Sequence, residues 1–155
     1  MSLPAILMKR GLLFSVFWYL AAGYSLAAEI STQSVQIKIE TILASDQSDE
    51  FDSRLAPLQR QLKVMKYRSY RLLKEESQTV PWQGSAAFEI PGGRSLAVTP
   101  QEFRDKRLAL KVGLQQGEKP LLDTTIRMNN GGNFLLGGPP HEGGALVISI
   151  WATAQ

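Results

Sequence analysis

Short runs in which apolar and polar residues alternate recur along the chain, and this pattern is typical of strands with one face in a core. Residues 35–43 (VQIKIETIL) open with a strict alternation, so we expect Val35, Ile37 and Ile39 to point inward. Further runs, of four to eight residues, occupy residues 67–73, 86–90, 95–98, 107–114, 121–128, 133–136 and 145–152. Glycine, proline, asparagine or aspartate separates them, as expected for turns between strands.

The last of these runs indicates where its strand lies. Residues 145–152 (ALVISIWA) carry apolar side chains on both faces, with Leu146 and Ile148 on one and Val147 and Trp151 on the other. A strand of this kind is either central in its sheet or covered on its second face.

A helical period interrupts the strands once, at residues 53–66. There, apolar residues recur on one face of a helix: Leu55, Leu58, Leu62 and Met65. Asp52 or Ser53 is expected to cap the helix, and Pro57 falls in its first turn, where a missing N–H costs little. The sequence therefore predicts a mainly β (α+β) fold: an antiparallel β-sandwich or curled sheet with one short helix, in a single domain of residues 31–155.

Residues 1–27 are predicted to be a signal peptide. Two basic residues precede a twelve-residue apolar run (GLLFSVFWYLAA), and Ser25 and Ala27 offer small side chains at a cleavage site. The alternative is an inner-membrane anchor, because residues 11–28 are 18 residues without a charge. We therefore expect an exported protein, periplasmic or extracellular, that contacts a membrane only through this segment if it is uncleaved.

Composition and charge exclude several classes of function. The chain of 155 residues has no cysteine and one histidine, which excludes disulfide scaffolds, thiol catalysis and multi-histidine metal sites. Two of its 17 basic and none of its 14 acidic residues lie in the predicted signal peptide, so the remaining chain carries a net charge of +1. Such a balance gives no electrostatic reason to bind nucleic acid. We expect no cofactor, no metal and no nucleic acid.

Two motifs imitate ligand sites. Glycine doublets lie at 92–93, 131–132, 137–138 and 143–144, but no Walker lysine follows them, so we expect turns that need positive φ. Four residues with side-chain oxygens have the alternate spacing of the ligands in a calcium-binding loop: Asp46, Ser48, Glu50 and Asp52. Phe51 stands where that loop needs glycine, and Pro57 where it needs glutamate. A solvated loop that leads into the helix cap is therefore the favoured interpretation.

Candidate catalytic and aromatic residues are few. His141 is the one histidine, and the sequence leaves Ser149 or Asp123 open as its partners in nucleophilic catalysis. A histidine at a loop tip is more typical of an inert surface residue, so no catalytic residue is assigned. Tyr67 and Tyr70 are expected to close the edge of the core with their hydroxyls in solvent, with sugar or peptide binding as the alternative.

One segment resembles a known family. Residues 123–138 (DTTIRMNNGGNFLLGG) hold a Thr-bearing strand, a polar turn with glycine, an apolar strand and a Gly-Gly pair. This arrangement resembles a hairpin of the bacterial secretin domain, although Pro139 and Pro140 follow where secretins have a large hydrophobic residue. The resemblance implies a hairpin in the β-barrel wall of an outer-membrane secretion or pilus pore. The whole arrangement also resembles short exported bacterial proteins.

These observations predict a non-enzymatic exported envelope protein: an interaction or accessory module of a secretion, pilus or surface assembly. Its partner would be another envelope protein, bound at an exposed strand edge or through a loop. The predicted binding loop consists of Pro139, Pro140, His141 and Glu142, held between two glycine doublets. The alternative is a small exported hydrolase or ligand-binding domain that uses the glycine-rich region 131–144.

Overall fold

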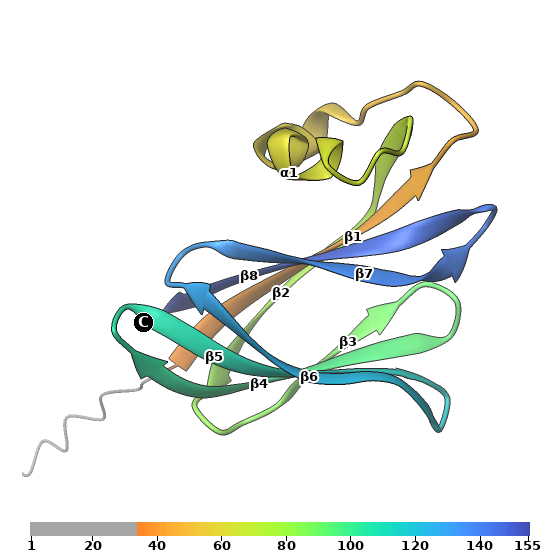
Figure 1. Cartoon of the computed structure of the whole chain (residues 1–155). Helices are drawn as coiled ribbons and strands as arrows, with labels where there is room; N and C mark the ends of the chain where they lie inside the picture. The colour runs from red at the N-terminus through yellow and green to blue at the C-terminus, as the bar shows by residue number, and fades with distance from the viewer. Residues whose placement is uncertain (1–33) are drawn as a thin grey trace, which may run out of the picture. The chain divides into compact units, whose positions relative to one another are not determined.

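The computed structural model describes residues 34–155, which form two antiparallel sheets and a short helical segment (Figure 1). The strands are β1 (Ser34–Ser45), β2 (Ser69–Pro81), β3 (Ala86–Ile90), β4 (Arg94–Arg104), β5 (Arg107–Gln116), β6 (Lys119–Asn129), β7 (Asn133–His141) and β8 (Gly144–Ala154). One sheet has the order β2-β1-β8-β7 and the other β3-β4-β5-β6. The predicted mainly β fold with one short helix is confirmed. The predicted signal peptide lies outside the described residues.

The main core lies between the two sheets. Val35, Ile37 and Ile39 of β1 point into it, as the alternation predicts, and are at most 2% exposed. Leu110 of β5 and Ile148 of β8 are fully buried in the same cluster. Side chains from both sheets therefore share one apolar layer, which is the arrangement of a β-sandwich.

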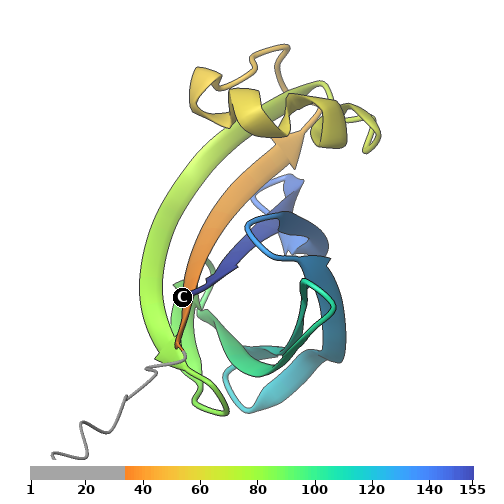
Figure 2. The ribbon, with the colours of Figure 1, turned by 90° about the vertical axis from the view of Figure 1, so that its left-hand side faces the viewer.

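A second, smaller core lies on the outer face of the sheet that contains β1 and β8. The helical segment consists of a 3₁₀ turn, η1 (Ser53–Leu58), and α1 (Gln59–Lys63). Its buried residues Leu55 and Leu62 pack with Ile42 of β1 and Val147 of β8. The strand of residues 145–152 is predicted to be either central in its sheet or covered on its second face, and both are confirmed. β8 lies between β1 and β7, and the helical segment covers its outer face at Val147. Figure 2 shows the helical segment at one end of β1 and β2.

The helix begins where the sequence predicts and ends earlier. Asp52 is the N-cap, and its side chain accepts a hydrogen bond from the Arg54 backbone N–H at 3.0 Å. The α-helix stops at Lys63, and Lys66 adopts a left-handed φ of 61° before β2 begins. The hydroxyl of Tyr70 is buried and donates to the Leu62 carbonyl at 2.6 Å, so the expectation of a solvated hydroxyl is wrong.

The resemblance of residues 123–138 to a secretin hairpin predicts that two adjacent strands pair. This prediction is also wrong, because β6 and β7 lie in different sheets. The connection between them is bonded to both sheets. The Asn130 N–H donates to the Lys106 carbonyl at 3.0 Å, and the Gly131 N–H donates to the Ala152 carbonyl of β8 at 2.9 Å. The turn residues therefore carry the chain from one sheet to the other.

Candidate functional site

The predicted binding loop is a tight hairpin. Pro139, Pro140 and His141 belong to β7, and Glu142 and Gly143 alone form the turn, with φ values of 45° and 76°. Two successive positive φ values are the geometry of a two-residue hairpin between twisted strands. The predicted loop, Pro139 to Glu142 between two glycine doublets, is therefore wrong in extent, since the strand includes Gly137 and Gly138 and continues to His141.

This hairpin is packed against neighbouring parts of the domain. Arg94, at the start of β4, donates through Nη2 to the Pro140 carbonyl and through Nη1 to the Pro91 carbonyl, both at 3.0 Å. A side chain at Gly144 would collide with the Ala44 carbonyl of β1. The hairpin is thus held by both sheets, and of the predicted loop residues Pro140 and Glu142 are exposed, with Glu142 at the tip.

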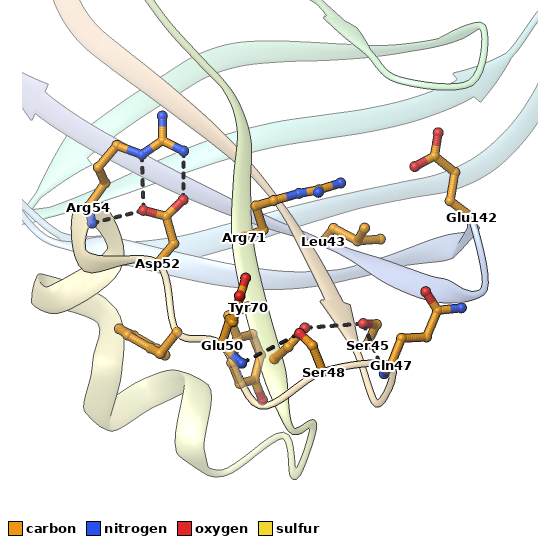
Figure 3. Close-up of a pocket in the computed structure, with 12 residues that line it drawn as sticks. Leu43, Ser45, Gln47, Ser48, Glu50, Asp52, Arg54, Tyr70, Arg71 and Glu142 are labelled. Atoms are coloured by element: carbon orange, nitrogen blue, oxygen red, sulfur yellow. Dashed lines mark hydrogen bonds and ion pairs between the residues drawn. The ribbon is translucent and has the colours of Figure 1, made fainter.

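A pocket of about 660 Å³ lies beside Glu142, at the end of β1 and the start of β2 (Figure 3). We call it the end pocket. Its lining residues are Leu43, Ser45, Gln47, Ser48, Glu50, Phe51, Asp52, Arg54, Ser69, Tyr70, Arg71 and Glu142. The hydroxyls of Ser45 and Ser69 lie 3.1 Å apart and are buried. Arg71 forms no side-chain hydrogen bond or ion pair with the described residues.

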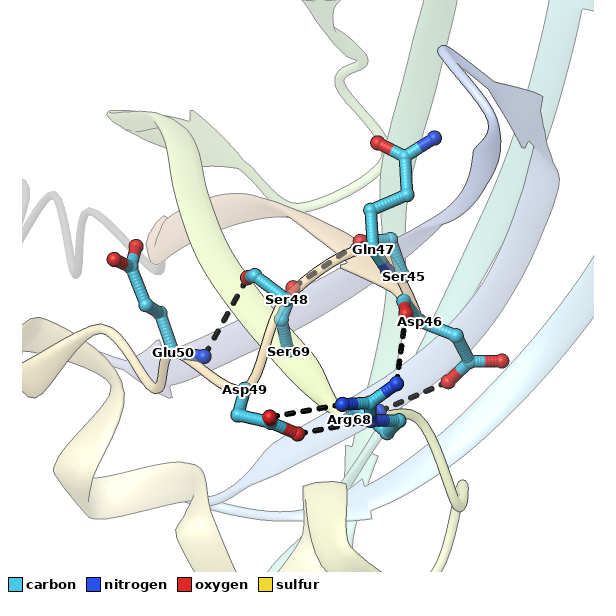
Figure 4. Close-up of polar contacts among 8 residues, drawn as sticks. All are labelled: Ser45, Asp46, Gln47, Ser48, Asp49, Glu50, Arg68 and Ser69. Atoms are coloured by element: carbon cyan, nitrogen blue, oxygen red, sulfur yellow. Dashed lines mark hydrogen bonds and ion pairs between the residues drawn. The ribbon is translucent and has the colours of Figure 1, made fainter.

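Arginines hold the loop that forms one wall of the end pocket. Arg68 donates to both carboxylate oxygens of Asp49 at 2.8 Å, and its backbone N–H donates to Asp46 at 3.0 Å (Figure 4). The hydrogen bond from Arg68 lowers the pKa of Asp49 below its usual range. A guanidinium that grips a carboxylate with two donors fixes its orientation as well as its position. The loop therefore has a defined shape.

A second ion pair between an arginine and a carboxylate lies at the start of the helical segment. Arg54 donates to Asp52 through Nε at 3.0 Å and through Nη2 at 2.6 Å. Together with backbone N–H donors, these bonds hold the pKa of Asp52 well below its usual range. Two carboxylates of the calcium-like pattern, Asp46 and Asp52, are thus bonded to arginine or backbone donors. Residues 34–155 contain no group of three or more His, Asp or Glu side chains arranged to hold a metal ion.

The candidate catalytic residues are not brought together. His141 lies at the end of β7, where its Nε2 is 3.7 Å from the Glu142 carboxylate. Ser149 is fully buried on the outer face of β8, and its hydroxyl accepts a hydrogen bond from the Asn133 side-chain amide at 3.4 Å. Asp123 lines a separate hollow on the other sheet. Within residues 34–155, His141 therefore has neither Ser149 nor Asp123 as a partner.

The free edge of β7 is the feature that sequence reasoning missed. This strand (NFLLGGPPH) contains no Asp, Glu, Lys or Arg, and Phe134, Leu135 and Leu136 are each only partly buried. Edge strands usually carry charges, which discourage pairing with another chain. The signal was present in the sequence as an uncharged run, but only the sheet order shows that the run lies at an edge.

The other free edges are protected. Gln78 and Lys74 of β2 reach over β3 and donate to its Ala87 and Glu89 carbonyls at 2.9 and 3.3 Å. The edge strand β6 exposes charged side chains, among them Arg127, which pairs with Glu102 at 3.0 Å. The edge strand β2 carries four charged residues within Arg71–Glu76. Among the four edge strands of residues 34–155, β7 is thus the one that carries no charged side chain, and Arg94 covers it only at the Pro140 carbonyl.

Comparisons with known proteins give one weak match. No family model matches the chain, and no curated protein matches it. Among solved structures, the chain is similar to the T2SS secretin XcpQ from Pseudomonas aeruginosa, with 12% sequence identity and a TM-score of 0.39. The similarity covers 79% of this chain and 56% of that one, so the chain spans little more than half of the secretin. No helix within residues 34–155 is long and apolar enough to cross a membrane.

Proposed function

We propose that the chain is a non-enzymatic interaction module of the bacterial envelope that binds a partner protein by strand addition at the free edge of β7. One observation carries this proposal: β7 is an edge strand with partly exposed apolar side chains and no charge. In strand addition, backbone hydrogen bonds supply affinity, and alternate side chains supply specificity.

The backbone of β7 has donors and acceptors available for such a partner. The Ala152 N–H of β8 donates to the Gly132 carbonyl at 3.4 Å, just before β7 begins. Residues of an antiparallel ladder direct their backbone groups alternately to one neighbour and the other. Phe134 and Leu136 therefore bond toward β8, while Leu135 and Gly137 direct their N–H and carbonyl groups away from it.

The sequence of β7 limits the length and the chemistry of the added strand. Pro139 and Pro140 have no backbone N–H to donate, so pairing with an added strand ends at Gly138, before the two prolines. Leu121 and Leu122 of the neighbouring sheet, like Phe134 and Leu136, are partly exposed where they pack against the main core. An extended segment with apolar residues at alternate positions would bury these side chains as it pairs.

The test places a charge on the free edge. Gly137 is exposed, and a side chain there would meet no atom within 4 Å, so Gly137→Lys should fold normally. Charged residues oppose edge pairing, so we expect this variant to lose capture of the partner from an envelope extract. Gly137→Ala is the matched control, and Thr125→Lys places the same charge on the edge of β6. Equal capture by Gly137→Lys and Gly137→Ala would reject β7 as the binding edge.

A further inference from the structure

A fixed tryptophan lies on the outer face of the β2-β1-β8-β7 sheet. Trp151 of β8 is half-buried, and its indole N–H donates to the carboxylate of Glu40 on β1. The Lys38 ammonium lies 3.6 Å from the same carboxylate oxygen and 4.9 Å from the centre of the indole ring. Three side chains from adjacent strands thus form one network.

This network gives Trp151 a defined position and leaves no net charge. Glu40 is only 5% exposed; it accepts the indole hydrogen bond and forms an ion pair with the Lys38 ammonium. A buried carboxylate is tolerated when donors satisfy it and an opposite charge balances it. The ammonium beside the ring adds a cation–π attraction. The ring is therefore ordered before any ligand arrives.

A depression of about 240 Å³ adjoins the ring, formed by Gln36, Lys38, Ser77, Trp151 and Thr153. These residues come from β2, β1 and β8, and the strand register places Ser77 and Trp151 on either side of Lys38. The hydroxyls of Ser77 and Thr153 make no side-chain hydrogen bond within residues 34–155, and the Gln36 amide makes one long contact of 3.4 Å with Gln155. An amide, two hydroxyls and an ammonium thus converge beside an aromatic ring with bonding capacity left over.

The composition of this depression selects one class of ligand. The backbones of β1 and β8 are paired on both sides, so an added strand has no free edge here. The charge of Lys38 is balanced by Glu40, which disfavours a simple anion, and four of the five lining side chains are polar, which disfavours an apolar ligand. We propose that this depression binds one ring of a neutral sugar beside the Trp151 side chain, with its hydroxyls bonded to Gln36, Ser77 and Thr153.

The test measures binding of three soluble oligosaccharides to the whole chain by isothermal titration calorimetry: tetraacetylchitotetraose, cellotetraose and maltotetraose. Ser77→Ala combined with Thr153→Val removes two exposed hydroxyls and leaves the core and the Trp151 network intact. Two lost hydrogen bonds should weaken binding by about tenfold. Trp151→Leu should abolish it. The matched control, Ser95→Ala combined with Thr125→Val on the outer face of the other sheet, should bind like the original protein.

Two results would overturn the proposal. One is that the unmodified chain binds none of the three sugars at millimolar concentration. The other is that the Ser77→Ala, Thr153→Val variant binds as tightly as the control. The double variant keeps the test decisive if Trp151→Leu fails to fold, because it changes exposed residues alone. Neither result bears on strand addition at β7, which uses other residues.

Discussion

At the scale of single residues, Asp52 joins the helical segment to β2. Its carboxylate accepts hydrogen bonds from the Arg54 backbone N–H at 3.0 Å, from the Arg54 side chain, and from the Leu72 backbone N–H at 3.1 Å. The capping rules predict Asp52 or Ser53 as the cap from the sequence. They do not identify Leu72 as its second partner, because that contact depends on how the loop folds back over β2.

The bonds to Asp52 predict a loss of stability in acid. Its pKa is lowered in the folded chain, so its contribution is present above the unfolded pKa of about 4 and is lost as the pH falls toward the folded value. The unmodified chain should therefore be more stable than Asp52→Asn at about pH 7, and this difference should shrink at about pH 3. Urea unfolding at both pH values measures it. A difference that is unchanged by acid would contradict the assigned bonds.

At the scale of elements, the β7–β8 hairpin needs glycine where it crosses β1. A Cβ atom at Gly144 would collide with the Ala44 carbonyl, whereas one at Gly137 would meet open space. Gly144→Ala should cost about 1–3 kcal/mol of unfolding free energy, the usual range for overpacking. Gly137→Ala should change it little. Thermal and urea unfolding of the two variants compares them, and equal stabilities would show that the hairpin does not press against β1.

The element scale also shows how far the sequence determines the fold. The inward faces of β1 and β8 follow from local alternation, so Val35, Ile37 and Ile148 are predicted correctly. Sheet membership does not follow, because it depends on which strands pair across long stretches of chain. The residues Asn129–Gly132 carry strong turn chemistry, and this chemistry suits a crossing between sheets as well as a hairpin. The doublet Gly137-Gly138 is predicted to form a turn but lies inside β7. The prediction fails for the same reason, because local composition does not specify hydrogen-bond partners.

At the scale of the whole molecule, the proposed envelope role requires export. The predicted signal peptide of residues 1–27 should be removed, which gives a mature N-terminus near Ala28 or Glu29. Mass spectrometry of the protein from envelope fractions measures this directly. A full-length chain in the inner membrane would favour the anchor alternative, and a full-length chain in the cytoplasm would exclude export.

The proposed binding site could be predicted only in part. The sequence places it near the β7–β8 connection, and Glu142 does lie exposed there beside the end pocket. The sequence did not identify the strand edge, because nothing local distinguishes an uncharged edge strand from an uncharged central one. The assembled sheet order makes that distinction, and it moves the proposed contact from the turn to the strand itself.

Amide hydrogen exchange tests strand addition most directly, because it reports on the backbone groups that the proposal uses. The measurement compares the free chain with the complex isolated by affinity capture. In the complex, exchange should slow at the amides of Leu135 and Gly137, whose N–H groups face away from β8, while the amide of Thr125 on the edge of β6 should be unchanged. Unaltered exchange at Leu135 and Gly137 in a complex that remains intact would contradict binding at the β7 edge.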